Sequence, residues 1–254
     1  MGYMTPIQEE THSGVTMRVH RFVEKRPIVR AIPNANPEAP SQYITERTDI
    51  HQLEVKLAGG SALIEPGALQ YMHGKITADV IRHEERGFLS RAMASSATGE
   101  SAYATKYEGT GEVWCEPTRK HFILATMEGE QDALLLDDKA FYACSAGISL
   151  STHNHTNLSG VLSGNGFRQP KITGSGVFAV ESPVPVEEVV HVELEGGKDL
   201  VVDGDFMLMY SASLQVSIGP LVKGLRNAAR SGEGLVYRFT GRGNVWLTPT
   251  AKVT

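Results

Sequence analysis

The sequence is short of several features that would assign it to a familiar class. Its 254 residues include only two cysteines, Cys115 and Cys144, which are too few for a disulfide framework. Neither has a histidine and an acid close by in the sequence to activate a thiolate, so we expect both to be small buried side chains. No secretory segment follows the start, and no apolar run nears the roughly 20 residues of a membrane-spanning helix. These absences predict a cytoplasmic protein without a transmembrane segment, although peripheral membrane contact stays open.

An excess of positive charge is also missing. Lys and Arg number 24 against 29 Asp and Glu, which gives a net charge of −5. This sign disfavours binding dominated by contacts to nucleic-acid phosphates, so no nucleic-acid partner is expected. What the chain does contain is 41% hydrophobic residues with 26 glycines and 12 prolines, a profile typical of ordered β structure.

Two glycine landmarks occur three times along the chain. A Gly-x-Gly segment precedes a large aromatic residue each time, and a turn signal precedes each of these segments at a similar distance. The first landmark comprises Gly109, Gly111 and Trp114, then Gly174, Gly176 and Phe178, then Gly241, Gly243 and Trp246. The second comprises Gly67, Asp137 and the pair Asp203 and Gly204. A repeat of about 66 residues predicts three tandem β modules, near 48–118, 119–183 and 184–254.

The repeat also predicts local structure. Apolar runs on either side of Asp203-Gly204 have the pattern of a β-hairpin. The Gly-x-Gly glycines suit positive φ or a bulge, and the two tryptophans are expected to be core anchors. One short helix is predicted at 220–230. The proline-interrupted segment 1–47 is interpreted as an extension and linker, in which 15–22 has the alternation of an edge strand.

The landmarks carry a resemblance to a known family. Gly87-Phe-Leu-Ser-Arg-Ala-Met93, Thr98-Gly-Glu100, the segment 109–114, Gly232-Glu-Gly-Leu235 and the segment 239–246 occur in the order found in the altered inheritance of mitochondria protein 24 family. The resemblance extends from about Gln52 to the C-terminus. It implies three modules of the fold seen in the tryptophan RNA-binding attenuator, each a β-sandwich or short double-stranded β-helix. It further implies a homotrimer with a pseudo-ninefold ring, and it carries over no catalytic residue.

Elementary physics favours the same assembly. A unit of about 65 residues buries only a modest core and leaves open sheet edges, and docking against the next unit removes both problems. One departure from the attenuator matters, because no Lys or Arg recurs at one position in all three copies. RNA binding would therefore be inherited by analogy alone. Small-ligand or RNA binding at the seams between modules remains an alternative function.

The strongest candidate for chemistry is His153-Asn-His155, the only histidine pair at i and i+2. In a strand both rings would share a face, as a cupin metal site requires, but no acid follows at a suitable spacing. Most of the aspartates 79, 137, 138, 203 and 205 are better interpreted as turn residues. The sequence thus favours a non-enzymatic oligomeric β scaffold or binding protein that needs no cofactor. A metal-dependent enzyme using His153 and His155 is the main rival.

Overall fold

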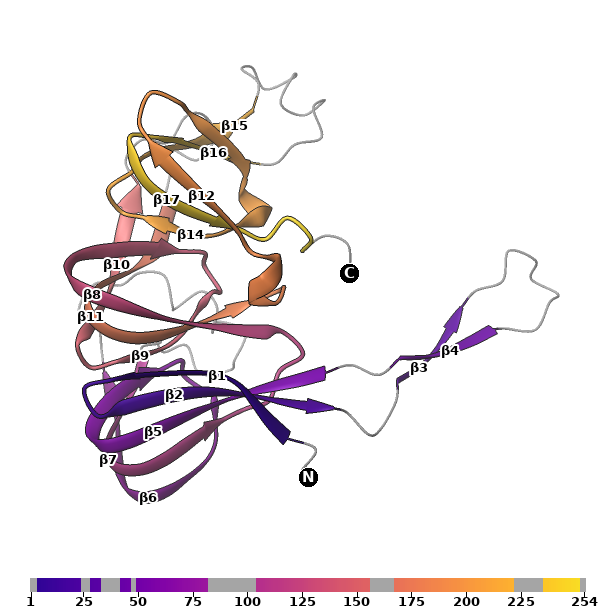
Figure 1. The fold of residues 1–254 in the computed structure, drawn as a ribbon, viewed down its shortest axis with the longest axis vertical. Helices are drawn as coiled ribbons and strands as arrows, with labels where there is room; N and C mark the ends of the chain where they lie inside the picture. Colours follow the sequence, from indigo (N-terminus) through magenta and orange to yellow (C-terminus); the bar gives the residue numbers. More distant parts are fainter. Residues whose placement is uncertain are drawn as a thin grey trace.

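A computed structural model describes residues 4–23, 28–32, 42–46, 49–81, 104–155, 167–221 and 235–251. These residues form antiparallel sheets, as the sequence predicts (Figure 1). The first strands are β1 (Met4–His12), β2 (Val15–Val23), β3 (Ile28–Ile32), β4 (Gln42–Glu46), β5 (Asp49–Ile64), β6 (Leu69–Ile81) and β7 (Ala104–Cys115). Then come β8 (His121–Leu136), β9 (Phe141–Ser145), β10 (Ile148–His155) and β11 (Phe167–Ser182). The last are β12 (Val190–Glu195), β13 (Leu200–Asp203), β14 (Met207–Ser211), β15 (Gln215–Pro220), β16 (Leu235–Thr240) and β17 (Arg242–Leu247).

Helical structure in the described residues is confined to two 3-10 turns, η1 (Val186–Glu188) and η2 (Gly204–Phe206). Pro220, the first residue of the predicted helix, instead ends β15. Apart from Leu221, the rest of 220–230 lies outside the described residues. In the part of the chain that the structure describes, no helix has the length and apolarity to cross a membrane.

The strands fall into three consecutive groups: β5 to β7, β8 to β11, and β12 to β17. In the first two, a pair of long strands forms the centre, β5 with β7 and β8 with β11. In the third the equivalent pair is divided into β12 with β17 and β13 with β16. Figure 1 shows the groups stacked along the long axis of the molecule, with β6 at one end and β15 and β16 at the other.

The groups are joined by two short ladders with the same design. Ala143–Ser145 of β9 pairs with Ile64–Ala62 of β5, and Met209–Ser211 of β14 pairs with Leu136–Leu134 of β8. We call the junction of the first and second groups the first seam, and that of the second and third groups the second seam. Because the second and third groups each pair one strand with the group before them, a sheet of 12 strands runs through all three.

The hairpin predicted around Asp203-Gly204 is wrong. β13 pairs with β16, whereas β14 pairs with β17 and β8, so the two apolar runs do not pair with each other. Gly204 begins a 3-10 turn whose first residues are held by the Asp203 side chain, which accepts a hydrogen bond from Asp205 N at 3.1 Å. The turn signal was real, but it marks a change of partner strand, from β16 for β13 to β17 and β8 for β14.

The Gly-x-Gly glycines have the positive φ that the sequence predicts, with values from 98° at Gly241 to 156° at Gly176. They also lie in tight places. A Cβ at Gly109 would lie 2.1 Å from the carbonyl oxygen of Lys75, and one at Gly174 would lie 2.3 Å from that of Gly147. The landmark is therefore a backbone requirement of conformation and of close strand approach.

The N-terminal segment contributes more than the predicted edge strand. β2 is internal, because it pairs with β1 on one side and with β5 on the other. The connection from Val23 to Asp49, which are opposite each other in the β2–β5 ladder, includes a separate hairpin of β3 and β4. This hairpin, which we call the arm, projects sideways from the stacked groups (Figure 1).

Candidate binding site at the second seam

The structure places His153 and His155 on one face of β10, as predicted, with ring centroids 4.6 Å apart. His155 is buried, and its Nε2 lies 2.8 Å from Gln169 Oε1 and 3.2 Å from the hydroxyl of Tyr210. Burial lowers the pKa of both histidines, which favours neutral rings. No set of three or more His, Cys, Asp or Glu side chains that could hold a metal is found in the described residues. The geometry therefore assigns His155 to a buried polar network.

The other reactive candidates are also structural. Cys115 and Cys144 are fully buried, and burial raises the pKa of each thiol to about 12, which keeps both protonated. Asp137 lies at the turn before β9, where burial is the main reason that its pKa is raised. Its backbone N–H donates to Leu208 O, next to the ladder that joins β14 to β8.

The two tryptophans have different roles, and this corrects the expectation that both are core anchors. Trp114 is 9% exposed and is stacked between His20 and Tyr71, at centroid distances of 4.8 and 5.8 Å. Trp246 is only half-buried and stacks on His191 at 5.1 Å. Trp246 is one of the residues that line a cavity at the second seam.

The first seam is filled by the N-terminal hairpin. Val15, Met17 and Val19 of β2 are at most 2% exposed. They belong to one apolar cluster with side chains from both adjoining groups, namely Leu53, Val55, Leu57, Val113, Leu124, Ala143, Val177 and Ala179. The Gln8 side chain completes the closure, because its Nε2 donates to Phe122 O and its Oε1 accepts from Leu124 N.

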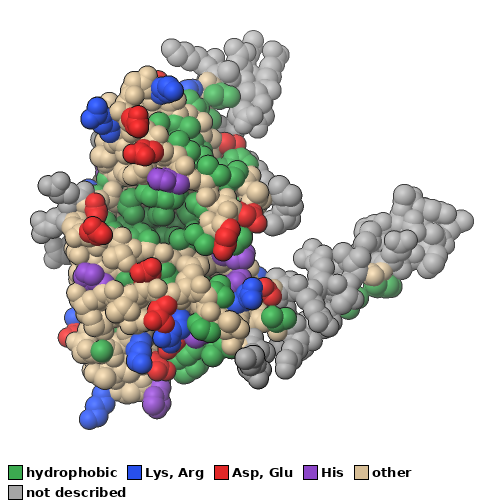
Figure 2. Space-filling model, in the orientation of Figure 1, with side chains coloured by type: hydrophobic (Ala, Val, Ile, Leu, Met, Phe, Trp, Pro, Cys, Tyr) green, Lys and Arg blue, Asp and Glu red, His purple; other side chains and the backbone are tan. Residues whose placement is uncertain are grey.

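The second seam contains a cavity of about 580 Å³. Apolar side chains from both groups line it, namely Ile123, Ala125, Met127, Leu134, Phe178, Val186, Val189, Met209 and Trp246. Figure 2 shows an apolar hollow on this face of the molecule, with acidic side chains on either side. Such a volume lies within the usual range of ligand pockets, about 300–1,000 Å³.

The cavity and the filled seam occupy corresponding positions, as the ladders show. Leu57 and Met127 each face the second glycine of a Gly-x-Gly segment, and Val55 and Ala125 face the residue two positions later. Across the seams, Ala143 and Met209 are the ladder partners of Ala179 and Trp246. The residues around β2 at the first seam thus have equivalents that line the open cavity at the second.

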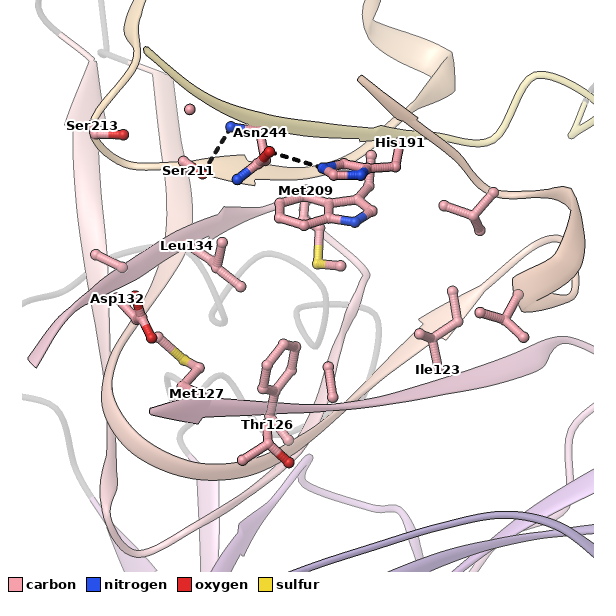
Figure 3. A pocket seen from close by; sticks show the side chains of 17 residues that line it. Ile123, Thr126, Met127, Asp132, Leu134, His191, Met209, Ser211, Ser213 and Asn244 are labelled. Carbon is pink, nitrogen blue, oxygen red and sulfur yellow. Dashed lines mark hydrogen bonds between the residues drawn. The ribbon is translucent and has the colours of Figure 1, made fainter. Parts of the chain in front are cut away.

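Polar side chains also line the cavity, namely Thr126, Asp132, His191, Ser211, Ser213 and Asn244. His191 Nε2 lies 2.8 Å from Asn244 Oδ1, which leaves the Asn244 amide nitrogen for a ligand (Figure 3). Asp132 accepts a hydrogen bond from Glu128 N at 3.0 Å and is the one charged residue of the lining. Since the lining contains no Lys or Arg, the site suits an apolar group that is neutral or positively charged at its outer end.

Sequence reasoning named Trp246 and the neighbouring glycines, but it missed the cavity. The sequence did contain one indication of the cavity, a difference in side-chain size at equivalent positions of the repeat. Ala179 is equivalent to Trp246, and Ala143 is equivalent to Met209. Large residues at the second seam stand where alanines stand at the first. This difference acquires meaning only when β2 is known to fill the first seam.

Taken together, fold and site define an all-β protein of serially joined strand groups with one open apolar seam. The chain belongs to the AIM24 family, described as mitochondrial biogenesis AIM24, whose model matches residues 43–250. β1, β2 and β3 lie before the matched region.

A solved structure shows the same fold. The crystal structure of a protein from Streptococcus pyogenes resembles this chain with a TM-score of 0.57 and 21% identity. The comparison covers 88% of this chain and 93% of that protein's chain. At this identity the likeness concerns the fold alone. No curated protein matches the chain.

Proposed function

We propose that the chain is a non-catalytic scaffold that assembles head to tail, with a homotrimer as the closed form. Its three strand groups are, in this proposal, three modules of the attenuator-like kind. The observation that carries the assembly is the repeated ladder between groups. It leaves two corresponding segments, one at each end of the molecule, without a partner strand on one edge in the part of the chain that the structure describes.

The segments are Tyr71–His73 of β6 and Leu200–Val202 of β13. Met72, Cys144 and Tyr210 occupy equivalent positions, because their ladder partners are Val113, Phe178 and Val245. The free edge of β6 at Met72 therefore corresponds to the edges by which β9 and β14 pair across the seams. Leu200 corresponds to Leu134 and Ala62, which receive those strands. Tyr71, Met72 and Val201 are 50%, 45% and 43% exposed. Pairing β6 with β13 of a second copy would cover them and continue the sheet.

A proline at Val201 tests this assembly. Asp137 N donates to Leu208 O, and Ala133 O accepts from Ala212 N, the residue after β14. The backbone N–H and C=O of Leu135 therefore also face this strand, and Val201 is the equivalent of Leu135. Val201→Pro should remove a hydrogen bond between copies and leave the β13–β16 ladder intact. Light scattering should show a trimer for the parent protein and for Val201→Thr, and a smaller mass for Val201→Pro with unchanged circular dichroism. A monomeric parent protein at micromolar concentration would refute the assembly.

Ligand binding at the second seam is a second candidate function. The supporting observation is the cavity, at which no strand among the described residues takes the place that β2 has at the first seam. RNA is a poorer candidate for this site, because the lining has an acid and no cation. Filter binding at two salt concentrations is the test, and salt-sensitive retention of RNA would reverse this order.

A further inference from the structure

The arm is a separate hairpin that exposes two large apolar side chains. β3 and β4 pair only with each other among the described strands. In the register of the two strands, position 29 is opposite 45 and position 31 is opposite 43, which puts Val29 and Tyr43 on one face of the arm. Val29 is 60% exposed and Tyr43 is 69% exposed. Because an isolated two-stranded hairpin is at best marginally stable in water, the arm needs a surface to pack against.

The second seam contains an apolar cavity that the arm could fill. Its cavity lies where β2, the strand just before the arm, fills the first seam. A strand cannot add to β8 there as β2 adds to β5, because Gln8 already bonds the backbone of Phe122 and Leu124. The cavity can therefore be filled by side chains that enter through its open side, without backbone pairing to β8. Tyrosine suits it, since the ring would pack on Trp246 and Met209 while the hydroxyl reaches Asn244 or Ser211.

Charge favours the same occupant. Asp132 lines the cavity, and Glu187 and Glu188 lie on η1 between the lining residues Val186 and Val189. In the sequence, the segment 24–48 that contains the arm has four Lys and Arg against three Glu, a net charge of +1. A small excess of positive charge on the inserted segment matches an apolar cavity with an acidic edge.

We propose that the arm of one copy inserts Tyr43 and Val29 into the second seam of another copy. This exchange rests on the proposed assembly, because Figure 1 shows the arm directed away from the body of its own chain. Each copy supplies one arm and one cavity, so a closed ring leaves none unpaired. The arm then fills a seam of a neighbouring copy, as β2 fills a seam of its own chain.

The two tryptophans make the test direct. Replacing Trp114 by Phe leaves Trp246, in the wall of the cavity, as the single fluorescent tryptophan. In that background we expect Tyr43→Ala to shift the emission of Trp246 to the red and to increase its quenching by acrylamide, because the indole becomes wetted. Val80→Ala, which removes a 68% exposed side chain from β6, is the matched control and should change neither.

A mixing experiment separates exchange from contact within one chain. Chains with Trp114→Phe and Tyr43→Ala report on an empty cavity. Chains with Trp114→Phe and Trp246→Phe have an intact arm and no tryptophan. After subunit exchange, mixing should shift the emission to the blue and lower the quenching.

Light scattering on the same samples assigns each result. A trimer whose Trp246 emission ignores Tyr43→Ala would overturn the exchange and leave the scaffold proposal standing. A change with Tyr43→Ala that mixing fails to reverse would place the arm in its own cavity and also overturn the exchange. A monomeric protein would overturn both proposals.

Discussion

The two seams of this protein are built on the same ladders, yet they differ in how they are filled. The first has an apolar core packed by β2 and a small pocket of about 220 Å³ beside it, whereas the second contains a cavity of about 580 Å³. At the first seam Val15, Met17 and Val19 lie between the groups and belong to one buried apolar cluster with side chains from both. At the second seam the equivalent positions surround about 580 Å³ of space. The difference does not come from strand pairing, which is shared. It comes from an extra hairpin supplied once, at the N-terminal end.

A cavity mutation at each seam should give the largest contrast. Met17→Ala removes a fully buried side chain from the first seam and should lower the free energy of unfolding by about 3 kcal/mol. Met209→Ala enlarges a space that already exists and should cost less, about 2 kcal/mol or below. Urea denaturation measures both, with Met4→Ala on the exposed β1 as the control. Equal losses for Met17 and Met209 would mean that the seams are equally packed.

Exchanging residues between the seams tests packing from the opposite direction. Ala143 is fully buried and is the equivalent of Met209. Ala143→Met should overpack the first seam and cost about 1–3 kcal/mol, because three further heavy atoms have no space there. Thermal unfolding would show the loss as a lower Tm. A variant as stable as the parent would show that β2 can move aside.

A pH experiment compares two acids at equivalent turns. Burial raises the pKa of Glu65, whose backbone N–H bonds Tyr142 O at the first seam, to about 7, with the charge of Glu181 adding to the effect. Since the folded-state pKa lies above the unfolded value, this carboxyl destabilises the fold progressively as the pH rises from about 4.5 to 7.

Glu65→Gln should therefore stabilise the protein at pH 8 by about 1–2 kcal/mol and leave it nearly unchanged at pH 4. Asp137→Asn should gain less, because backbone N–H groups of Asp138 and Lys139 partly offset the burial of Asp137. Denaturation at several pH values provides the measurement. A pH-independent effect of Glu65→Gln would remove the assignment.

Filling the hollow should have the smallest effect. Ala125 corresponds to Val55 of the first seam and lines the cavity. Ala125→Val adds two methyl groups where there is room, so we expect a gain of about 0.5–1 kcal/mol in the free energy of unfolding. Ala179→Val, at the fully buried side of the first seam, is the matched comparison and should lose stability. A loss for Ala125→Val would indicate that the cavity closes in solution.

Much of the fold could be predicted from local chemistry. The Gly-x-Gly glycines predict positive φ, because other residues avoid this conformation. Gly109 and Gly174 adopt it. The family follows from the order of the same landmarks. The hairpin around Asp203-Gly204 was predicted wrongly, since a turn residue reports a change of direction and not the partner strand. The candidate site escaped prediction because its cavity depends on Met127, Met209 and Trp246, which are far apart in the sequence.

The sequence by itself determined the β class, the burial of both cysteines and the glycine positions, because each depends on the composition or the backbone preference of a few neighbouring residues. Only the tertiary structure decided that β2 fills one seam, that Trp246 lines the other, and that the arm pairs with none of the other described strands. Those outcomes depend on which surfaces meet, and contacts between distant strands are set by the packing of the whole molecule.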